Sequence, residues 1–409
     1  MGVNRNISSW GKTSKKEVKV YNQIDDIEQI LPIGNLNSYG DSCIPRGNNV
    51  FEFGDKNLVN TTILEYTKHN KKKLFGIPGK ANVTLGGAIA SDVHGKDNLW
   101  GGTFSKNIEQ MSIQIDKDKI ITTSRTENKE LFYSTIGGLG LTGLIVDIQI
   151  KNNLENFKEI AKTTVEKGQG LASMFKNFEF EESCYWSCWI DLVGSKQKWI
   201  SYKTKEHDQS SKKIQNKSLF LEFNENKITF NLSNKLFLKN LNYFYYIFSK
   251  EKVKTDIIYE TLYPIKSFYD TRYLAGREGL IQIQFVIPVH KENEAEKLLS
   301  LLTQKNNPIL CSVKRITDAE GILSFCKNGW TFALDFSKKS FNSSNLNAFY
   351  KKLIEVGGSI YLAKDSLLDE ESFLNMYPQI EEWRKSVQYF DPKNKFQSSL
   401  SDRLRIKNW

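Results

Sequence analysis

The chain has 409 residues, of which 39% are hydrophobic and 12% are aromatic. This composition excludes a disordered protein, and the length is enough for two domains that each have a core. Lysine and arginine total 57 against 47 acidic residues, so the net charge is +10. Such an excess favours an anionic partner, namely a phosphorylated substrate, a membrane surface or nucleic acid, unless the scattered lysines are only a solvated surface.

Signals for targeting and for metal binding are weak. The N-terminal stretch MGVNRNISSWGKTSKK lacks the apolar segment of a signal peptide, and no apolar run approaches the ~18 residues of a membrane span. The five cysteines are irregularly spaced and lack a second Cys/His pair, which predicts free thiols and no metal centre. We expect a cytoplasmic protein, with peripheral contact at the inner face of a membrane as an option.

Residues 26–153 alternate short apolar runs with glycine-rich turns, which predicts short strands joined by loops. The expected strands are VFEF, KLFGIPG, MSIQI, KIITT and LIVDIQIK, and residues 127–136 are expected to form a helix. From about residue 154 the expected strands become longer and more aromatic, at SCYWSCWIDLVG, SLFLEFNENKITFNL, LIQIQFVIPVH and GWTFALDFS. Helical patterns occur between them at 163–176, 291–304 and 343–356. This change predicts an α+β protein whose second domain is an antiparallel sheet flanked by helices.

Three other segments are distinctive. Residues 204–218 are polar and predict a loop, and the chain from about residue 366 is expected to be helical with a basic tail. Residues 236–250, LFLKNLNYFYYIFSK, combine aromatic side chains with lysine. That segment is either an interfacial helix that touches lipid or a helix that packs on the second domain.

Residues 138–143, GLGLTG, match the pattern GxGxxG. A dinucleotide-binding turn of the Rossmann type needs a strand before the glycines and a helix after them. Here the helical ELFYSTI precedes the glycines and the strand-like LIVDIQIK follows, so we reject a Rossmann site. The glycines still indicate a close approach of the backbone to another group.

Two more stretches are rich in small residues, at 34–41 and 76–95. Successive backbone N–H groups in such loops can bind anions, so three stretches together could enclose a large phosphorylated cofactor. The second stretch ends in GGAIASDVHGK, which contains His94, one of only four histidines. On local sequence alone, His94 is either a group in a binding site or a side chain that caps a turn.

The order PIGNLNSYGD, PGKANVTLGGAIASDVHGK and ENKELFYSTIGGLGLTGLIVDIQI resembles the FAD domain of flavoenzymes of the vanillyl-alcohol oxidase type. Within that type the likeness is to the decaprenylphosphoryl-ribose oxidase family, and it continues through LIQIQFVIP, GWTFALDF and much of the C-terminal part. The resemblance implies a two-domain FAD-binding fold of the vanillyl-alcohol oxidase type. Residues 1–153 would form the FAD-binding domain, completed by residues 360–409, and residues 154–359 would form the substrate-binding domain.

The resemblance also implies the residues that contact FAD. In the first stretch they are Gly34, Asn35, Leu36, Asn37, Ser38, Tyr39, Gly40 and Asp41. In the second stretch they are Gly79, Thr84, Leu85, Gly86, Gly87, Ser91, Asp92, Val93 and His94, and Ile145 and Tyr361 are expected to close the site. Some relatives attach FAD through a histidine in the first loop, but residues 32–43 contain none, so we expect non-covalent FAD.

The resemblance assigns catalytic positions to Lys364, His94 and Tyr39. A lysine whose pKa is lowered by burial can accept the proton of a substrate hydroxyl. The expected substrate-binding residues are Gln282, Gln284, Lys314, Thr331 and Ala333. Gln282 and Gln284 share one strand face, where buried amides need partners, and Lys314 would suit a phosphate.

Two of these positions depart from the family. Ala333 replaces a cysteine beside the flavin, and Thr331 replaces an asparagine, so the departures concern the substrate pocket. Ala275 also replaces a tyrosine of the family, and the chain between Ile24 and Ile33 is shorter than expected. None of these changes is expected to affect the binding of the flavin.

The resemblance implies an FAD-dependent oxidoreductase that acts on the CH–OH group of a sugar. The expected reaction is oxidation of the 2'-hydroxyl of a polyprenyl-phosphoryl pentose, as the oxidase half of an epimerase in cell-wall or surface polysaccharide synthesis. The expected partner is an NAD(P)H-dependent short-chain reductase. The alternatives are a soluble alditol or aldonolactone oxidase and, in another class, a non-catalytic basic binding protein. No basic–aromatic recognition motif is present, so no nucleic-acid partner is expected.

Overall fold

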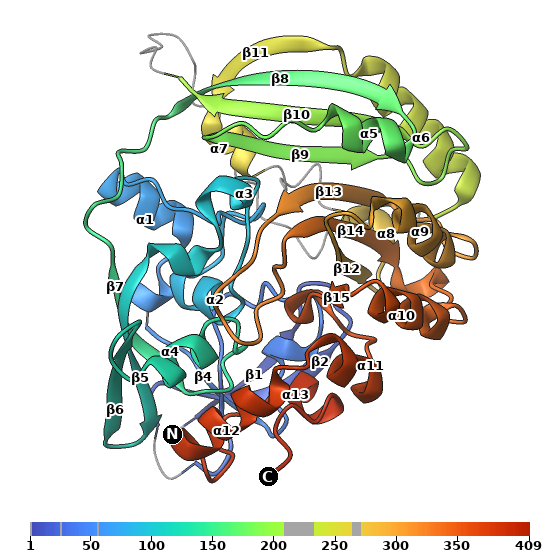
Figure 1. Cartoon of the computed structure of the whole chain (residues 1–409). Helices are drawn as coiled ribbons and strands as arrows, with labels where there is room; N and C mark the ends of the chain where they lie inside the picture. The colour runs from blue at the N-terminus through green and yellow to red at the C-terminus, as the bar shows by residue number, and fades with distance from the viewer. Residues whose placement is uncertain (1, 25–26, 55–56, 208–232, 264–270) are drawn as a thin grey trace.

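The protein is described here from a computed structural model that covers residues 2–24, 27–54, 57–207, 233–263 and 271–409. These residues fold into three β-sheets with helices packed around them (Figure 1). The expected α+β class is confirmed.

Two small sheets come from the first part of the chain. Strands β1 (Val3–Ser8), β2 (Lys15–Tyr21), β3 (Leu31–Pro32) and β4 (Asn49–Phe51) pair in the order β1-β2-β4-β3. Strands β5 (Ile108–Asp116), β6 (Lys119–Ser124) and β7 (Leu144–Ile150) form an antiparallel sheet in the order β6-β5-β7. Along the chain, the short helices α1 (Ile63–Asn70), α2 (Leu85–Ala90) and α3 (Asn98–Gly101) lie between β4 and β5, and α4 (Lys129–Thr135) lies between β6 and β7.

Four of the strands expected in this part are therefore confirmed, but KLFGIPG is a loop and that prediction was wrong. Gly76 has a φ of +67°, which a regular strand does not adopt, and its backbone N–H donates to the carboxylate of Asp97. Pro78, two residues later, has no backbone N–H to give to a sheet. The loop instead runs to the wall of a cavity described below.

The stretch GLGLTG has the order of elements expected from the sequence. Helix α4 precedes it and strand β7 follows it, so the rejection of a Rossmann turn is confirmed. Gly140 and Gly143 have φ values of +76° and +146°, which explains why glycine occupies both positions.

The rest of the chain builds one sheet of eight antiparallel strands, in the order β11-β8-β10-β9-β13-β14-β12-β15. Its strands are β8 (Ile160–Gln169), β9 (Cys184–Ile190), β10 (Lys198–Glu206), β11 (Lys252–Ile257), β12 (Leu280–Pro288), β13 (Leu310–Ile316), β14 (Gly329–Ser337) and β15 (Ser359–Ile360). The expected strands at SCYWSCWIDLVG, LIQIQFVIPVH and GWTFALDFS are confirmed.

Alternation along these strands gives the sheet two different faces. One face packs against helices α5 (Leu171–Asn177), α9 (Ala295–Thr303) and α10 (Leu346–Glu355) in the largest core cluster, which includes Ile283 and Phe285. The other face carries Gln282 and Gln284 and meets helix α6 (Lys235–Phe248) at the β8–β10 end (Figure 1). Helices α7 (Ile258–Leu262) and α8 (Arg272–Ala275) follow along the chain.

The helices expected at 291–304 and 343–356 correspond to α9 and α10, but the helix expected at 163–176 was largely wrong. Residues up to Gln169 belong to β8, which pairs with β10 on one side and β11 on the other. Pairing on both edges outweighs the local helical pattern. Helix α5 begins only after Gly170, whose φ is +81°.

The C-terminal helices α11 (Glu370–Met376), α12 (Ile380–Phe390) and α13 (Ser399–Arg403) return to the first part of the chain (Figure 1). The indole of Trp383 donates to the backbone oxygen of Ser134, 2.9 Å away, and Phe396 pairs with Ile30 in an isolated β-bridge. Residues 360–409 must pack on the N-terminal part of the chain in this way if the two are to form one domain. The boundary at 153/154 stays a prediction, and the largest core cluster draws on both sides of it.

Within the described residues, no helix combines the length and the apolar character needed to cross a bilayer. The same residues contain no group of three His, Cys, Asp or Glu side chains arranged for a metal ion, and all five cysteines are free thiols. The loop expected at 204–218 and the strand expected at SLFLEFNENKITFNL lie mostly or wholly outside the described residues.

Candidate active site

A large cavity of about 880 Å³ lies between the glycine-rich loops and the eight-stranded sheet. Its size falls within the range of about 300–1,000 Å³ that is usual for small-molecule and cofactor sites. Residues from 32–43, 77–96 and 139–145 line it, so the three stretches singled out in the sequence meet at one place. We call this side of the cavity the loop wall.

The loop wall depends on close contacts that only glycine permits. A Cβ atom on Gly34 would lie 2.5 Å from Oγ1 of Thr84, and one on Gly86 would lie 2.4 Å from a methyl carbon of Val59. A Cβ atom on Gly40 would lie 1.5 Å from the backbone oxygen of Asp365. The loop wall therefore packs through bare backbone on Thr84, Val59 and Asp365, where a side chain would collide.

The opposite side, which we call the sheet wall, is built from side chains. Register places Gln284 opposite Ala333, Ala333 opposite Ser312, and Ser312 opposite Trp189. This row crosses four strands, from the amide of Gln284 at one end to the indole of Trp189 at the other. Since all four residues line the cavity, one end of the sheet wall is polar and the other aromatic.

His94 is 5% exposed and lies where the two walls meet. The amide nitrogen of Gln284 donates to His94 Nε2 over 2.9 Å and to Thr331 Oγ1 over 3.1 Å. Burial first, and then the charges of Lys314 and Lys364, hold the pKa of His94 well below its ordinary value. A neutral ring that accepts at Nε2 carries its proton on Nδ1, and Nδ1 has no hydrogen-bond partner among the described residues.

Lys364 ends the 3₁₀ turn η6 (Leu362–Lys364) and points into the cavity. Its Nζ lies 3.5 Å from the centroid of the Tyr39 ring, a cation–π contact, and the backbone N–H of Tyr39 donates to the oxygen of Ala363. Burial lowers the pKa of Lys364 to about 7; the carboxylate of Asp335 opposes this shift and the charge of Lys314 adds to it. Near neutral pH this amine is therefore in part uncharged and able to accept a proton.

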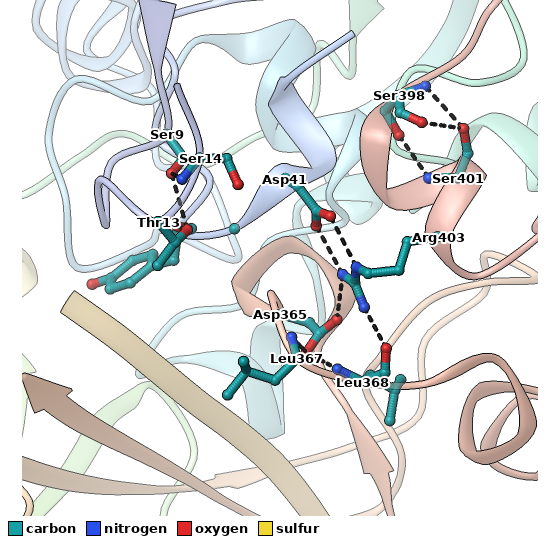
Figure 2. A network of polar contacts seen from close by, with 12 residues as sticks. Ser9, Thr13, Ser14, Asp41, Asp365, Leu367, Leu368, Ser398, Ser401 and Arg403 are labelled. Atoms are coloured by element: carbon teal, nitrogen blue, oxygen red, sulfur yellow. Dashed lines mark hydrogen bonds and ion pairs between the residues drawn. The ribbon is translucent and has the colours of Figure 1, made fainter. Parts of the chain in front are cut away.

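An arginine joins the first loop to the turn that carries Lys364 (Figure 2). The guanidinium of Arg403 binds both carboxylate oxygens of Asp41 at 2.8 and 2.9 Å, and Nη2 also binds Asp365 at 2.8 Å. Asp365 in turn accepts from the backbone N–H groups of Leu367 and Leu368. This clamp fixes the distance between Tyr39 and Lys364, because each is a near neighbour in sequence of a clamped carboxylate.

Two further lysines make the cavity strongly positive. Lys314 Nζ lies 3.5 Å from the backbone oxygen of His94, and Lys96 Nζ contacts the backbone oxygen of Thr261. Burial lowers the pKa of Lys314 to about 8 and that of Lys96 to about 7, and the charge of Lys314 contributes to the second shift. A bound anion would offset this mutual repulsion, so the site favours a ligand with a phosphate or a similar group.

Comparisons with known proteins identify relatives of the chain. No family profile matches it. Over 357 residues the chain is 25% identical to decaprenylphosphoryl-beta-D-ribose oxidase of Mycolicibacterium smegmatis, an alignment that covers 81% of this chain and 75% of that protein. The chain is a homologue of that oxidase. The predicted resemblance is thus confirmed.

Shorter matches extend to other oxidoreductases. The chain is 32% identical over 69 residues to cytokinin dehydrogenase 2 of Arabidopsis thaliana, or 17% of this chain and 14% of that protein. It is 23% identical over 140 residues to D-arabinono-1,4-lactone oxidase of Debaryomyces hansenii, or 34% and 22%. The expected enzyme class, an oxidoreductase, is confirmed by these homologues, and they support the expected flavin cofactor.

The cavity of this oxidase homologue fits a large polar cofactor. Its loop wall supplies bare backbone at Gly34, Gly86 and Gly87. Three buried polar atoms of cavity-lining residues, Asn37 Oδ1, Ser42 Oγ and His94 Nδ1, have no hydrogen-bond partner among the described residues. Buried polar atoms require partners, so a flavin in this position would satisfy a need that the protein leaves open.

Most of the predicted site residues line this cavity. They are Gly34, Asn35, Leu36, Asn37, Ser38, Tyr39, Gly79, Thr84, Gly86, Gly87, Ser91, Val93, His94, Ile145, Gln282, Gln284, Lys314, Ala333, Tyr361 and Lys364. Their predicted roles stay predictions, because placement alone assigns none of them.

Five predicted residues lie behind the walls instead: Gly40, Asp41, Leu85, Asp92 and Thr331. Leu85 is fully buried in a core cluster, and Asp92 accepts a hydrogen bond from Ser324. Asp41 belongs to the arginine clamp, and Thr331 supports Gln284. Of the five, Asp41 and Thr331 contact groups that position the lining residues Lys364 and Gln284.

Several residues that line the cavity were not predicted from the sequence. Lys96 stands two positions after His94 in the stretch GGAIASDVHGK, so its place beside the site was visible in the sequence. Asp335 shares a strand face with Ala333, and the period of two in β14 was a signal for it. Trp189, Tyr245 and Leu241 form the aromatic end, which only the placement of α6 reveals.

Proposed function

We propose that the protein is an FAD-dependent oxidase that acts on the 2'-hydroxyl of a polyprenyl-phosphoryl pentose, as the oxidase half of an epimerase. Its fold would be the two-domain fold of the vanillyl-alcohol oxidase type. The observation that carries the proposal is the meeting of the three glycine-rich stretches with His94, Lys364 and the two glutamines around one cavity. The long match to decaprenylphosphoryl-beta-D-ribose oxidase supports the choice of substrate.

In this proposal the loop wall holds FAD without a covalent bond, since residues 32–43 contain no histidine. When bound, the flavin supplies the acceptor for a hydride from the carbinol carbon. Lys364, partly neutral, takes the hydroxyl proton at Nζ, while the contact with Tyr39 fixes its direction. Holding the reactants in this geometry can contribute roughly 7–11 kcal/mol to lowering the barrier.

The sheet wall would position the sugar and its phosphate. Gln282 and Gln284 face the cavity and offer amide groups to sugar hydroxyls, and Lys314 and Lys96 supply positive charge for the phosphate. Ala333 leaves space beside them. The keto-sugar product would pass to an NAD(P)H-dependent short-chain reductase, which returns it as the epimer.

The test is anaerobic mixing of the FAD-loaded protein with a polyprenyl-phosphoryl pentose while the flavin absorbance is followed. We expect rapid bleaching in the wild type and at least a hundredfold slower bleaching in Lys364→Met. A loaded protein that no phosphorylated pentose bleaches would contradict the proposed substrate. A protein that stays colourless after FAD is added would contradict the proposed cofactor as well.

A second candidate is a soluble alditol or aldonolactone oxidase, which the match to D-arabinono-1,4-lactone oxidase favours. Such a substrate carries no phosphate, so Lys314→Ala would leave its oxidation nearly unchanged. A polyprenyl-phosphoryl substrate should instead lose affinity by about tenfold or more in the same variant, since one charged hydrogen bond contributes ~1.5–3 kcal/mol.

A further inference from the structure

Helix α6 (Lys235–Phe248) is unusual because its solvent-facing side is apolar. Only Leu238 and Asn242 of the helix are fully buried. Among the exposed residues, Leu236 is 69% accessible and Phe248 is 74% accessible. An ordinary surface helix buries its apolar stripe and exposes its polar one, so this helix is reversed.

The exposed apolar residues gather on one side of the helix, which we call the strip. At 100° per residue, Leu236, Phe244 and Ile247 fall on the side opposite Leu238 and Asn242, and Phe248 lies on its flank. The exposed Asn240 lies between Leu236 and Phe244. Phe244 and Phe248 stack on one another, with ring centroids 6.1 Å apart. Contiguous exposed patches of this kind mark sites of interaction rather than ordinary surface.

The strip is not needed to hold the helix in place. The side chain of Asn242 donates to Asp191 over 2.7 Å, and the ring of Tyr245 packs on Trp189 with centroids 4.9 Å apart. Lys167 also donates to the backbone oxygen of Ser249 at the end of the helix. These contacts all lie on the sheet side, so the strip itself faces outward.

Lysines border the strip. Lys235 and Lys239 are exposed on the helix, and Lys250 and Lys252 are exposed on either side of Glu251, just after the helix. The helix itself contains no acidic residue. Aromatic and aliphatic side chains bordered by lysines are the composition of helices that lie in the interface of anionic membranes.

The strip also adjoins the cavity. Phe237 and Leu241, on the flank of the strip, line the cavity together with Tyr245 and Trp189. Helix α6 therefore separates solvent from the aromatic end of the site. In Figure 1 it lies at the end of strands β8–β10, away from helices α12 and α13.

We propose that α6 docks the protein on a lipid bilayer with anionic headgroups, with Leu236, Phe244, Ile247 and Phe248 inserted among the lipids. The aromatic end of the cavity then opens at the membrane, where the lipid chain of a membrane-bound substrate passes between Phe237 and Leu241. The second statement rests on the proposed function; the first stands on the exposed strip and its lysines alone.

The test is flotation of the FAD-loaded protein with vesicles of phosphatidylcholine containing a third phosphatidylglycerol. The wild type should float with these vesicles, and binding should weaken at high salt or with pure phosphatidylcholine. The double variant Phe244→Ser/Phe248→Ser should bind at least tenfold more weakly. Tyr389→Ser, which alters another exposed ring at 80% accessibility on α12, is the matched control and should bind as the wild type does.

Three outcomes would overturn the docking proposal. The first is a wild-type protein that ignores anionic vesicles, and the second is a double variant that floats as the wild type does. The third is a wild-type dimer in size-exclusion chromatography that the double variant converts to a monomer, because the strip would then join two copies of the chain.

A second measurement separates this proposal from the proposed function. Flavin reduction by a phosphoryl pentose with a short, water-soluble isoprenoid should be the same in the double variant and the wild type. Reduction by a long-chain substrate embedded in vesicles should fall at least tenfold in the variant; an unchanged rate would contradict entry at the membrane. Vesicle binding without reduction by any pentose would leave the docking intact and refute the proposed substrate.

Discussion

The two walls of the cavity are built in different ways. The loop wall is formed by backbone, with glycines where a single Cβ atom would collide with a neighbouring stretch. The sheet wall is formed by side chains that alternate along paired strands, so its chemistry can change without altering the backbone. A wall that tolerates little change therefore faces a wall whose side chains can vary.

The strongest test of the difference between the two walls is Gly40→Ala, which adds a side chain to the closely packed loop wall. The added Cβ would lie 1.5 Å from the backbone oxygen of Asp365, so the first loop and the turn that carries Lys364 must separate. We expect a loss of at least ~3 kcal/mol in the free energy of unfolding and no retained flavin. Thermal unfolding and the ratio of flavin to protein absorbance measure both effects.

Gly47→Ala is the matched control, since its nearest contact would be 3.7 Å away. It should retain flavin and wild-type stability. Equal behaviour of the two variants would mean that close backbone approach does not define the loop wall.

The next largest effect is expected for Lys364→Met, on the rate rather than on folding. The side chain keeps its length, but no amine remains to accept the proton, so the rate of flavin reduction should fall about 10²–10⁴-fold. In the wild type this rate should rise as the pH passes about 7, because the lowered pKa makes the amine neutral above that value. Stopped-flow reduction between pH 5.5 and 9 checks the profile.

In Lys364→Arg the charge persists throughout that range, so the rate should stay low at every pH. A variant that keeps the wild-type rise near pH 7 would show that another group is the proton acceptor.

A third variant, Arg403→Gln, opens the clamp between the walls. The carboxylates of Asp41 and Asp365, which are 12% and 4% exposed, would lose their shared cation. We expect a loss of about 3 kcal/mol in the free energy of unfolding, measured with urea, together with weaker flavin retention. Arg405→Gln is the control, because Arg405 forms an ion pair that is largely exposed. Equal stability of both variants would mean that the ion pairs of Arg403 do not stabilise the fold.

The smallest effect is expected for Thr331→Val, behind the sheet wall. The hydroxyl that accepts from Gln284 is lost while the shape is kept, so the free energy of unfolding should fall by ~1 kcal/mol. Since Gln284 also holds His94, KM for the sugar should rise a few-fold with little change in flavin content. Thr331→Ser retains the hydroxyl and should behave as the wild type; an identical loss in Ser would point to packing rather than to the hydrogen bond.

The contrast between the walls also explains what could be predicted from sequence. Positions of close approach require glycine, so the stretches containing Gly34, Gly86 and Gly140 could be recognised in the sequence. That they lie around one cavity is seen only in the structure. The placement of Gln282 and Gln284 on one face followed from the period of two. Asp335 obeys the same period but was missed, because its importance depends on the neighbouring Lys364, which comes from another part of the chain.

Errors arose where long-range pairing decides the local structure. Residues up to Gln169 carry a helical pattern but form β8, because their backbone groups pair with strand β10 on one side and strand β11 on the other. A turn forms at Gly76 in place of the expected strand, because the backbone N–H of Gly76 donates to the carboxylate of Asp97. The clamp at Arg403 could not be foreseen, since its partners are separated from it by as many as 362 positions.

That same separation has a consequence for the order of events during synthesis. Asp41 emerges from the ribosome early, but its guanidinium partner Arg403 emerges only when almost all of the 409 residues have been translated. Until then the first loop lacks Arg403, Phe396 and Ser398, and its geometry is not fixed. Cofactor loading is therefore expected to be a late, post-translational step, so a truncated or stalled chain would be left without flavin.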